Sequence, residues 1–298
     1  MRKLLKWVAG LLGVFVLLVL ALYALAWFKS ERAMAKTYTV ADPPLAIARD
    51  PAAIARGAHV FATRGCSECH GAGAEGKLVF DAGPVMKVVG PNITRGGQLM
   101  QMTPDQVGAA IRHGVGRDGH PLVFMPAEDF HEMSDEDTAA LVAFLQSLPP
   151  SANRPPALEV RPLGRILYLF GEFPLLPAEK LDHSPRSRSA PAMGATADYG
   201  KYLAKGCSGC HGADFGGQHV PGTPPKFPDS QNLTPGNLGE WTQADFFRAI
   251  RDGTRPDGSK LDPFMPWQTY AKMTDIELGA LWAYFRSLPP VQSKPRKD

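Results

Sequence analysis

The four cysteines of this chain form two pairs with the same spacing, and a histidine directly follows each pair. A Cys-x-x-Cys-His motif is typical of covalent haem attachment, because two thiols at this spacing can bond the two haem vinyl groups and the adjacent imidazole can bind the iron. We therefore expect two covalently bound haem c groups. The predicted thioether links are Cys66, Cys69, Cys207 and Cys210, and the predicted iron ligands beside them are His70 and His211.

Paired cysteines also occur in disulfides, in zinc sites and in thioredoxin-like redox motifs. Zinc ribbons and thioredoxins do not require a histidine immediately after the second cysteine. A thioredoxin-like motif also needs a βαβ context, and the sequence around neither pair has that pattern. The sequence therefore favours haem over these three alternatives.

A second iron ligand is expected further along each copy. Met125 lies 55 residues after His70 and Met265 lies 54 residues after His211, both in the sequence Phe-Met-Pro. A lone methionine most often fills a gap in a core. The matched position, the following proline and the order along the chain instead predict Met125 and Met265 as the distal ligands.

Other residues compete for this role. His120 or His131 is the alternative ligand in the first copy. Met133 and Met273 are a matched pair directly before the last helix, so we expect them to pack in the core. We expect the histidines without a partner in the other copy to be solvated or hydrogen-bonded groups at the surface: His113, His120, His131, His183 and His219.

Two protein ligands on each iron would leave no open position for oxygen or peroxide, which favours electron transfer over haem catalysis. The sequence also has no cysteine outside the two motifs that could serve as a distal ligand in a sulfur-oxidising enzyme. We therefore expect an electron carrier and not an enzyme. The alternative is a dihaem redox enzyme, either peroxidase-like or oxidising a sulfur compound.

The two motifs belong to an internal repeat with a spacing of about 140 residues. Asn92-Ile93-Thr94 matches Asn232-Leu233-Thr234, and Leu148-Pro149-Pro150 matches Leu288-Pro289-Pro290. The repeat predicts two copies of one module, over residues 50–150 and 196–290, joined by a linker at 151–195 and followed by a tail at 291–298. The Asn and Thr residues are expected either near haem edges or in turns.

Each module has the pattern of a small helical domain. Helices are expected before the haem motifs, over Pro51–Thr63 and Asp198–Ala204. Capping residues predict further helix starts at Thr103, Ser134, Thr242 and Thr274. The last helix of each module has apolar residues at helical spacing and is ended by a Pro-Pro pair.

The linker contains an apolar stretch over residues 166–170 and the pair Leu175-Leu176. We expect this segment to pack against a module, since exposed apolar residues most often cover their own protein. A partner-binding strip is the alternative.

An uncharged apolar run extends from Trp7 to Phe28, after three basic residues, Arg2, Lys3 and Lys6. About 20 residues suffice to span a bilayer as a helix, and a signal-peptide core is usually shorter. We expect a retained membrane anchor over residues 1–29 with a cytoplasmic N-terminus, and a juxtamembrane linker over 30–49. A cleaved signal peptide is the alternative, because small-residue sites occur at residues 24–26 and 33–35.

The net charge of +3 hides an uneven distribution. The first module has seven basic against twelve acidic residues, and the second has nine against ten. Both modules are mildly acidic, which argues against a nucleic-acid partner.

The motif from Cys66 to Gly71, the Asn92-Ile93-Thr94 segment and Met125-Pro126 resemble a class I cytochrome c domain. The second copy, with Trp241-Thr242 and Met265-Pro266, is similar to the membrane-bound cytochrome c subunits of periplasmic alcohol and gluconate dehydrogenases. The resemblance covers residues from about 50 to 290. Those subunits typically carry three haem motifs and a C-terminal anchor, whereas this chain has two motifs and an N-terminal apolar run.

This resemblance implies an all-α fold of two tandem class I cytochrome c domains after an N-terminal transmembrane helix. It also implies Met125 and Met265 as axial ligands. The implied location is the bacterial inner membrane, crossed once, with the haem domains in the periplasm. The implied role is respiratory electron transfer, with a dehydrogenase, an oxidase or a soluble cytochrome as redox partner.

Overall fold

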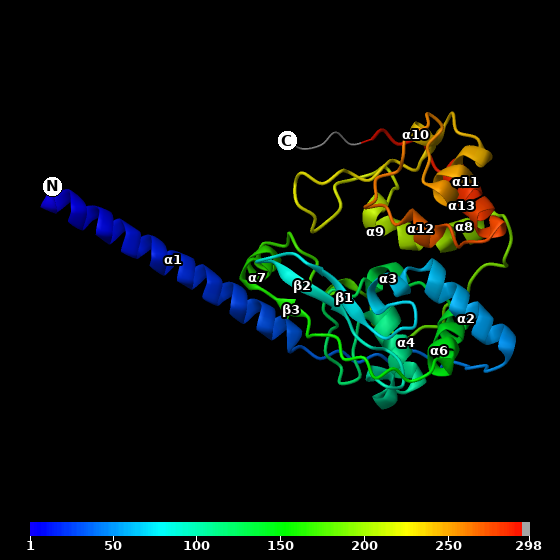
Figure 1. The fold of residues 1–298 in the computed structure, drawn as a ribbon, viewed down its shortest axis with the longest axis horizontal. Helices are drawn as coiled ribbons and strands as arrows, with labels where there is room; N and C mark the ends of the chain where they lie inside the picture. Colours follow the sequence, from blue (N-terminus) through cyan, green and yellow to red (C-terminus); the bar gives the residue numbers. More distant parts are fainter. Residues whose placement is uncertain (294–298) are drawn as a thin grey trace.

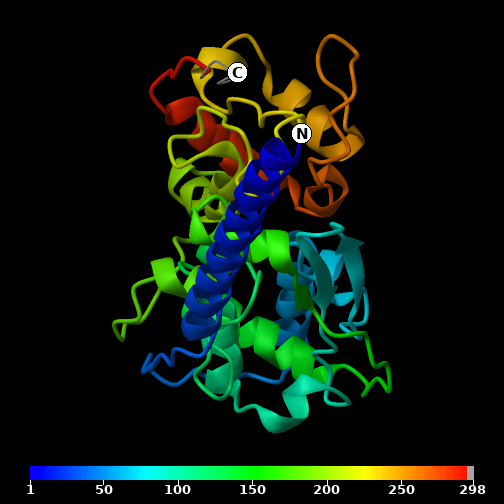
Figure 2. The same ribbon diagram turned by 90° about the vertical axis from the view of Figure 1, so that its left-hand side faces the viewer.

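The computed structural model describes residues 1–293, so residues 294–298 of the expected tail lie outside the described part. Helix α1 (Arg2–Met34) projects from the rest of the chain, which forms two lobes (Figure 1). One lobe surrounds each Cys-x-x-Cys-His motif, and Figure 2 shows the lobes stacked one above the other behind α1.

The two lobes contain corresponding helices in the same order, and the second lobe has one additional 3-10 turn, at Ala204–Cys207. The first contains α2 (Pro51–Thr63), α3 (Cys66–His70), η1 (Gln98–Gln101), α4 (Pro104–His113), α5 (Ala127–Phe130) and α6 (Asp135–Ser147). The second contains α8 (Ala197–Leu203), η3 (Ala204–Cys207), α9 (Ser208–His211), α10 (Pro235–Leu238), α11 (Gln243–Asp252), α12 (Trp267–Tyr270) and α13 (Asp275–Ser287). The predicted all-α fold with two tandem domains is confirmed.

The predicted helix starts are confirmed by their caps. The side chains of Thr103, Ser134, Thr242 and Thr274 each accept a backbone N–H from the residue three positions later. Three of these caps are complete capping boxes, all but the one at Ser134. The cap satisfies a backbone donor that the first turn leaves unpaired, which is why the sequence signal is reliable here.

The first and last helices of each lobe cross in close contact. A Cβ atom at Gly57 of α2 would lie 2.0 Å from the carbonyl oxygen of Ala140 in α6. At the equivalent crossing of α8 and α13, a Cβ at Gly200 would lie 1.9 Å from the carbonyl oxygen of Ala280. Only glycine allows the two backbones to approach this closely. Each haem motif follows the first helix of its lobe. The crossing therefore fixes the start of the motif relative to the last helix.

A small antiparallel sheet in the first lobe is not predicted from the sequence. It has the order β1 (Lys77–Asp81), β2 (Met86–Gly90), β3 (Glu159–Val160), and a bulge interrupts the β1–β2 register between Leu78 and Phe80. Strand β3 comes from the linker and pairs Val160 with Met86. The linker therefore extends the fold of the first lobe.

The rest of the linker also packs on the first lobe. Helix α7 (Pro162–Leu169) lies against the end of α1, and a 3-10 turn, η2 (Pro177–Lys180), follows it. Leu175 and Leu176 are buried together with residues of β2. The expectation that the apolar linker residues cover their own protein is confirmed for this pair.

Two of the contacts between the lobes are equivalent by the repeat. His59 of α2 lies 2.8 Å from Glu277 of α13, measured from imidazole Nε2 to carboxylate Oε2. In the opposite direction, the Tyr202 hydroxyl of α8 donates to the Asp137 carboxylate of α6 at 2.5 Å. His59 and Tyr202 each follow the crossing glycine of their helix by two residues. The interface therefore resembles the isologous contact of a symmetric dimer within one chain.

The His59–Glu277 pair gives the lobe interface a predictable pH dependence. The hydrogen bond to Glu277 raises the pKa of His59 above its ordinary value. The contribution of this ion pair to the free energy of unfolding is therefore complete below about pH 6.5. It is lost as the pH rises through the raised pKa of His59. Glu277→Gln keeps a side chain that can cap α13 but removes the charge.

We expect Glu277→Gln to lower the free energy of unfolding at pH 6 by about 1 kcal/mol relative to the native chain, with a smaller deficit at pH 9. Urea unfolding followed by circular dichroism measures both values. Glu136→Gln is the control, because the Glu136 side chain is 72% exposed and pairs with Arg56 within the first lobe. An equal deficit at both pH values would contradict this role of the pair.

Candidate haem sites

Each lobe contains a cavity at its Cys-x-x-Cys-His motif. The first cavity has a volume of about 620 Å³ and is lined by Cys66, Cys69, His70 and Met125, among others. The second has a volume of about 560 Å³, and its lining includes Cys210, His211 and Met265. Both volumes fall within the usual range for cofactor sites. The structure thus brings each predicted distal methionine to the same cavity as the histidine of its motif.

The two motif histidines are oriented in the same way. Nδ1 of His70 donates to the carbonyl oxygen of Pro91 at 3.0 Å, and Nδ1 of His211 donates to that of Gln231 at 2.7 Å. Within residues 1–293, no hydrogen bond engages Nε2 of either ring. A metal-binding histidine characteristically donates its other N–H to a carbonyl or carboxylate, which fixes the ring and leaves one nitrogen for the metal.

Burial lowers the pKa of both imidazoles below the ordinary value, so both rings are neutral near pH 7. A neutral imidazole is the form that can donate a lone pair to iron. Orientation and protonation state therefore both fit a haem iron facing the cavity.

The carbonyls that orient these rings were not predicted from the sequence. Pro91 and Gln231 directly precede Asn92 and Asn232, at matching positions of the repeat. A backbone carbonyl can be supplied by any residue type, so these two positions carry no side-chain signal.

The Asn-Thr segments after these carbonyls form turns, which is one of the two roles that the sequence left open. The side-chain oxygen of Asn92 accepts from the Thr94 N–H at 3.0 Å, and its amide donates to the Ser151 carbonyl at 2.9 Å. Asn232 bonds in the same way to Thr234 and Val291. Each segment thus ties the chain that leaves the last helix to the loop that carries the orienting carbonyl.

The thiols lack the thiolate character that a zinc or redox site requires. Burial raises the pKa of Cys66 and of Cys207 to about 12, and it also raises the pKa of Cys69 and Cys210. A reactive or zinc-binding cysteine instead requires a thiolate and an electropositive environment. All four cysteines are free of disulfides. Among residues 1–293, no group of three or more His, Cys, Asp or Glu residues is placed to hold a metal ion.

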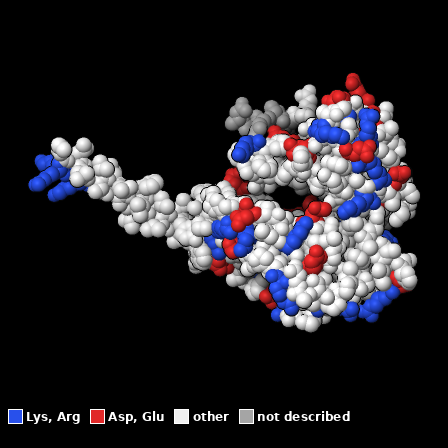
Figure 3. Space-filling model, viewed as in Figure 1, with Lys and Arg blue, Asp and Glu red and all other residues white. Residues whose placement is uncertain are grey.

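The first cavity extends to the second lobe. Its lining includes Cys207, Tyr270 and Met273 as well as the first motif. Two hydrogen bonds cross here: Asp129 accepts the Gly209 N–H, and the Thr269 hydroxyl donates to Glu68 at 2.9 Å. Figure 3 shows the hollow between the two lobes. The two Cys-x-x-Cys-His motifs therefore face each other across the lobe interface.

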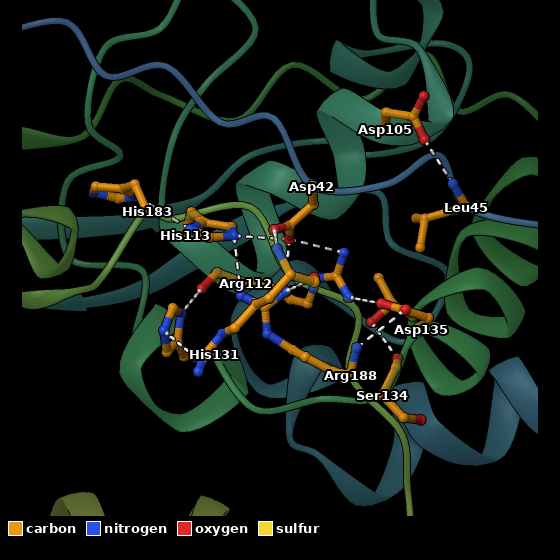
Figure 4. Close-up of polar contacts among 12 residues, drawn as sticks. Asp42, Leu45, Asp105, Arg112, His113, His131, Ser134, Asp135, His183 and Arg188 are labelled. Atoms are coloured by element: carbon orange, nitrogen blue, oxygen red, sulfur yellow. Dashed lines mark hydrogen bonds and ion pairs between the residues drawn. The ribbon is translucent and has the colours of Figure 1, made fainter.

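The expectation that the remaining histidines lie at the surface is wrong for His113 and His131. Their exposed fractions are 0% and 8%. Nε2 of His113 lies 2.9 Å from an Asp42 carboxylate oxygen, and Nδ1 of His131 donates to the Arg112 carbonyl at 2.8 Å (Figure 4). The juxtamembrane segment around Asp42 and the linker around Arg188 cover both rings, and the sequence does not reveal that coverage.

The distal-ligand alternatives also have other partners. His120 and His131 are both absent from the lining of the first cavity, and Nδ1 of His120 lies 3.4 Å from the carbonyl oxygen of Lys36. Met133 and Met273 are 4% and 3% exposed, which confirms their predicted packing in the core. In the first cavity, Met125 is the predicted candidate that faces the haem space.

Comparison with known proteins also indicates one cytochrome c domain in each lobe. The family model described as Cytochrome c matches residues 54–149 and 197–289, one range in each lobe and well over half of the chain together. The alcohol dehydrogenase (quinone) cytochrome c subunit of Gluconacetobacter polyoxogenes is 34% identical over 130 residues, covering 41% of this chain and 27% of that protein. The gluconate 2-dehydrogenase cytochrome c subunit of Pantoea cypripedii is 36% identical over 95 residues, covering 29% and 22%.

A relative of similar overall length is the diheme cytochrome c-type protein of Cereibacter sphaeroides. It is 26% identical over 267 residues, covering 80% of this chain and 86% of that protein. By contrast, the chain spans only about a quarter of the length of the dehydrogenase subunits. Since the family model matches once around each cavity, the chain belongs to the cytochrome c family.

Proposed function

We propose that the protein is a membrane-tethered c-type cytochrome with two haems, which carries electrons on the periplasmic side of a bacterial inner membrane. It would accept them from a dehydrogenase or a quinol-oxidising complex and deliver them to an oxidase or a soluble cytochrome. The observation that carries this proposal is the repeated pairing, in each of two cavities, of an oriented motif imidazole with a methionine thioether.

The residues that would hold the haems are those expected from the sequence. Cys66 and Cys69, with Cys207 and Cys210, would form the thioether links, and His70 with Met125 and His211 with Met265 would bind the irons. When bound, the haem supplies the one-electron redox chemistry. The side chains would fix its position, and ligation by the methionines would leave no open site for oxygen or peroxide. These roles fit a carrier better than an enzyme.

The tether is supported by helix α1. Among residues 1–293 it is the one helix long and apolar enough to cross a membrane. Its apolar run is almost entirely exposed, and the basic residues Arg2, Lys3 and Lys6 precede the run at the free end, where Figure 3 shows Lys and Arg side chains. A basic N-terminal end favours a cytoplasmic N-terminus, with both lobes on the other side.

The names of the relatives support a dehydrogenase as the redox partner. Several are cytochrome subunits of alcohol, gluconate or fructose dehydrogenases. A dehydrogenase is therefore the first electron donor to test.

Production in a host that matures c-type cytochromes tests the proposal. We expect the protein to stay in the membrane fraction after an alkaline carbonate wash, to have the mass of the intact chain plus two haems, and to take up two electrons in a reductive titration. The control, Cys207→Ser with Cys210→Ser, should take up one. A soluble protein with a processed N-terminus would refute the tether, and peroxide turnover by the native chain would favour the enzyme alternative.

A further inference from the structure

Helix α7 is fixed against the end of the proposed membrane span by its one charged side chain. The Arg165 guanidinium lies 3.9 Å from the centre of the Trp27 ring, and its Nη2 is 2.6 Å from a Glu31 carboxylate oxygen. At the far end of α7, the Lys29 ammonium donates to the Leu169 carbonyl at 3.1 Å. These contacts hold α7 beside residues 27–31 of α1.

The contact reaches into the apolar run itself. Ala26 and Ser30 of α1 are fully buried, and Leu22, one turn before Ala26, is partly buried. These residues recur every four positions and so share one face of α1, the face on which Ser30 accepts a hydrogen bond from Arg165. Ala26 lies inside the run from Trp7 to Phe28. Helix α7 therefore lies level with the last turn of the run.

The length of the apolar run determines how deep in the bilayer the contact between α1 and α7 lies. The run contains 22 residues, and a bilayer core about 30 Å thick takes about 20 residues of helix. Little of the run remains to extend beyond the core. Ala26 and Trp27 must then lie at the boundary between the hydrocarbon and the headgroups, and α7 must lie at the same depth.

The side of α7 away from the protein is apolar. Leu163 and Phe170 are 39% and 63% exposed, and Ile166 between them is partly exposed. Their spacing places them in one stripe along the helix. The only charged residue between Pro162 and Phe170 is Arg165, which is buried and paired with Glu31. This stripe presents no charge to its surroundings.

We propose that Leu163 and Ile166 of α7, with Phe170 directly after the helix, enter the lipid–water interface beside α1, as a second contact between the protein and the bilayer. The inference rests on the proposed function in one respect, the retention of α1 as a membrane span. A single span leaves an attached domain free to tilt about it. Helix α7, locked to α1 by Arg165, would fix how both lobes, and the cavities in them, stand above the membrane.

A lipid-quenching experiment on the holoprotein tests this. Phe170→Cys and Met193→Cys are each labelled with bimane, since the four native cysteines are taken up by haem. Met193 is the matched control: it is 64% exposed, and it lies four residues before α8, a helix that Figure 1 shows on the side of the molecule away from α1. Each variant is reconstituted in phosphatidylcholine–phosphatidylglycerol vesicles, with or without brominated acyl chains. Energy transfer to the haems also lowers bimane emission. It cancels in the ratio of the emission with brominated lipid to the emission without it, taken for each variant.

We expect brominated lipid to reduce the emission from position 170 about twofold, as for a residue buried at the acyl boundary, and to leave position 193 unchanged. Unquenched emission at both positions 170 and 193 would overturn the proposal. A stripe that binds a membrane protein instead of lipid would give this same result. Unaltered haem absorption and circular dichroism spectra show that each variant is folded.

A third label separates this inference from the proposed tether. Leu18→Cys places bimane in the middle of α1, where the native side chain is 63% exposed. Quenching at position 18 without quenching at position 170 refutes the interfacial contact and leaves the tether intact. If position 18 is also unquenched, the tether fails and the interfacial contact fails with it.

Discussion

Replacing Met125 or Met265 by histidine is expected to lower one reduction potential of the protein and to leave the other close to its native value. Methionine–histidine ligation raises the potential of a haem iron relative to two imidazoles. Axial ligands set haem potentials over a range of about 0.8 V, so we expect a fall on the order of 0.1–0.3 V. Each variant would also lose about half of the absorption band that reports a methionine–iron bond, since one of two such bonds is removed.

Spectroelectrochemical titration of the purified variants measures both quantities and assigns each potential to its lobe. Met133→Leu is the control, because Met133 is a buried core residue of the same lobe as Met125 and does not line the cavity. It should keep both potentials and the full band. A Met125→His variant with the native potentials and an intact band would show that Met125 is not the ligand.

Replacing Asp42 by alanine is expected to destabilise the first lobe strongly. The Asp42 carboxylate lies 2.6 Å from the Arg188 guanidinium, 3.1 Å from that of Arg112 and 2.9 Å from Nε2 of His113, and its side chain is only 7% exposed (Figure 4). The change would leave two buried guanidinium groups without this shared anion. Removing one partner of a buried ion pair costs about 3–5 kcal/mol.

Urea unfolding at pH 7 measures this loss. The control is Asp105→Ala, because Asp105 also binds the juxtamembrane segment, by accepting the Leu45 N–H at 2.9 Å, but it does so at the surface. Its loss should cost no more than about 1 kcal/mol. Equal effects of the two substitutions would mean that the buried charges do not govern the stability of this region.

Lowering the pH is also expected to destabilise the first lobe. Burial lowers the pKa of His113 to about 4, so the unfolded chain binds this proton more readily, and stability falls as the pH drops from about 6.5 towards 4. Burial tends to raise the pKa of Asp42, but the bonds from His113, Arg186 and Arg188 outweigh it and hold the pKa at about 2. The contribution of Asp42 is therefore complete above about pH 4 and is lost below that.

Local sequence signals predicted the main helices of the two lobes, which are α2, α4, α6, α8, α11 and α13. The cap at Thr103 was correct, because it depends on contacts within a few residues. Met125 was placed in its cavity, because the repeat separated it from the other methionines of its module. Helix α8 differs from its prediction by one residue at each end, the usual uncertainty of fraying helix termini.

The features that depend on distant segments could not be predicted. Asp42, Arg112 and Arg188 come from the juxtamembrane segment, α4 and the linker, and each looks like a surface charge in its own sequence context. Strand β1 of the β1–β2 hairpin has no fully buried residue, so its apolar–polar alternation is weak. The ion pair between the two lobes joins His59 to Glu277, 218 residues later in the sequence.

The contact between the lobes matters most for the proposed carrier. Because the first cavity includes Cys207 in its lining, the interface sets the separation of the two haem motifs, and the repeat alone gives no information about that separation. Substitutions at His59 or Tyr202 would therefore alter the relation between the sites without touching a predicted ligand.

Peptide mass mapping of the purified, full-length protein tests the central claim most directly. After proteolysis, residues 66–70 and residues 207–211 should each appear in a peptide that carries one haem, with none of the four thiols available to an alkylating reagent. A colourless protein from a host that matures c-type cytochromes, with four alkylated cysteines and no haem on either peptide, would contradict the account.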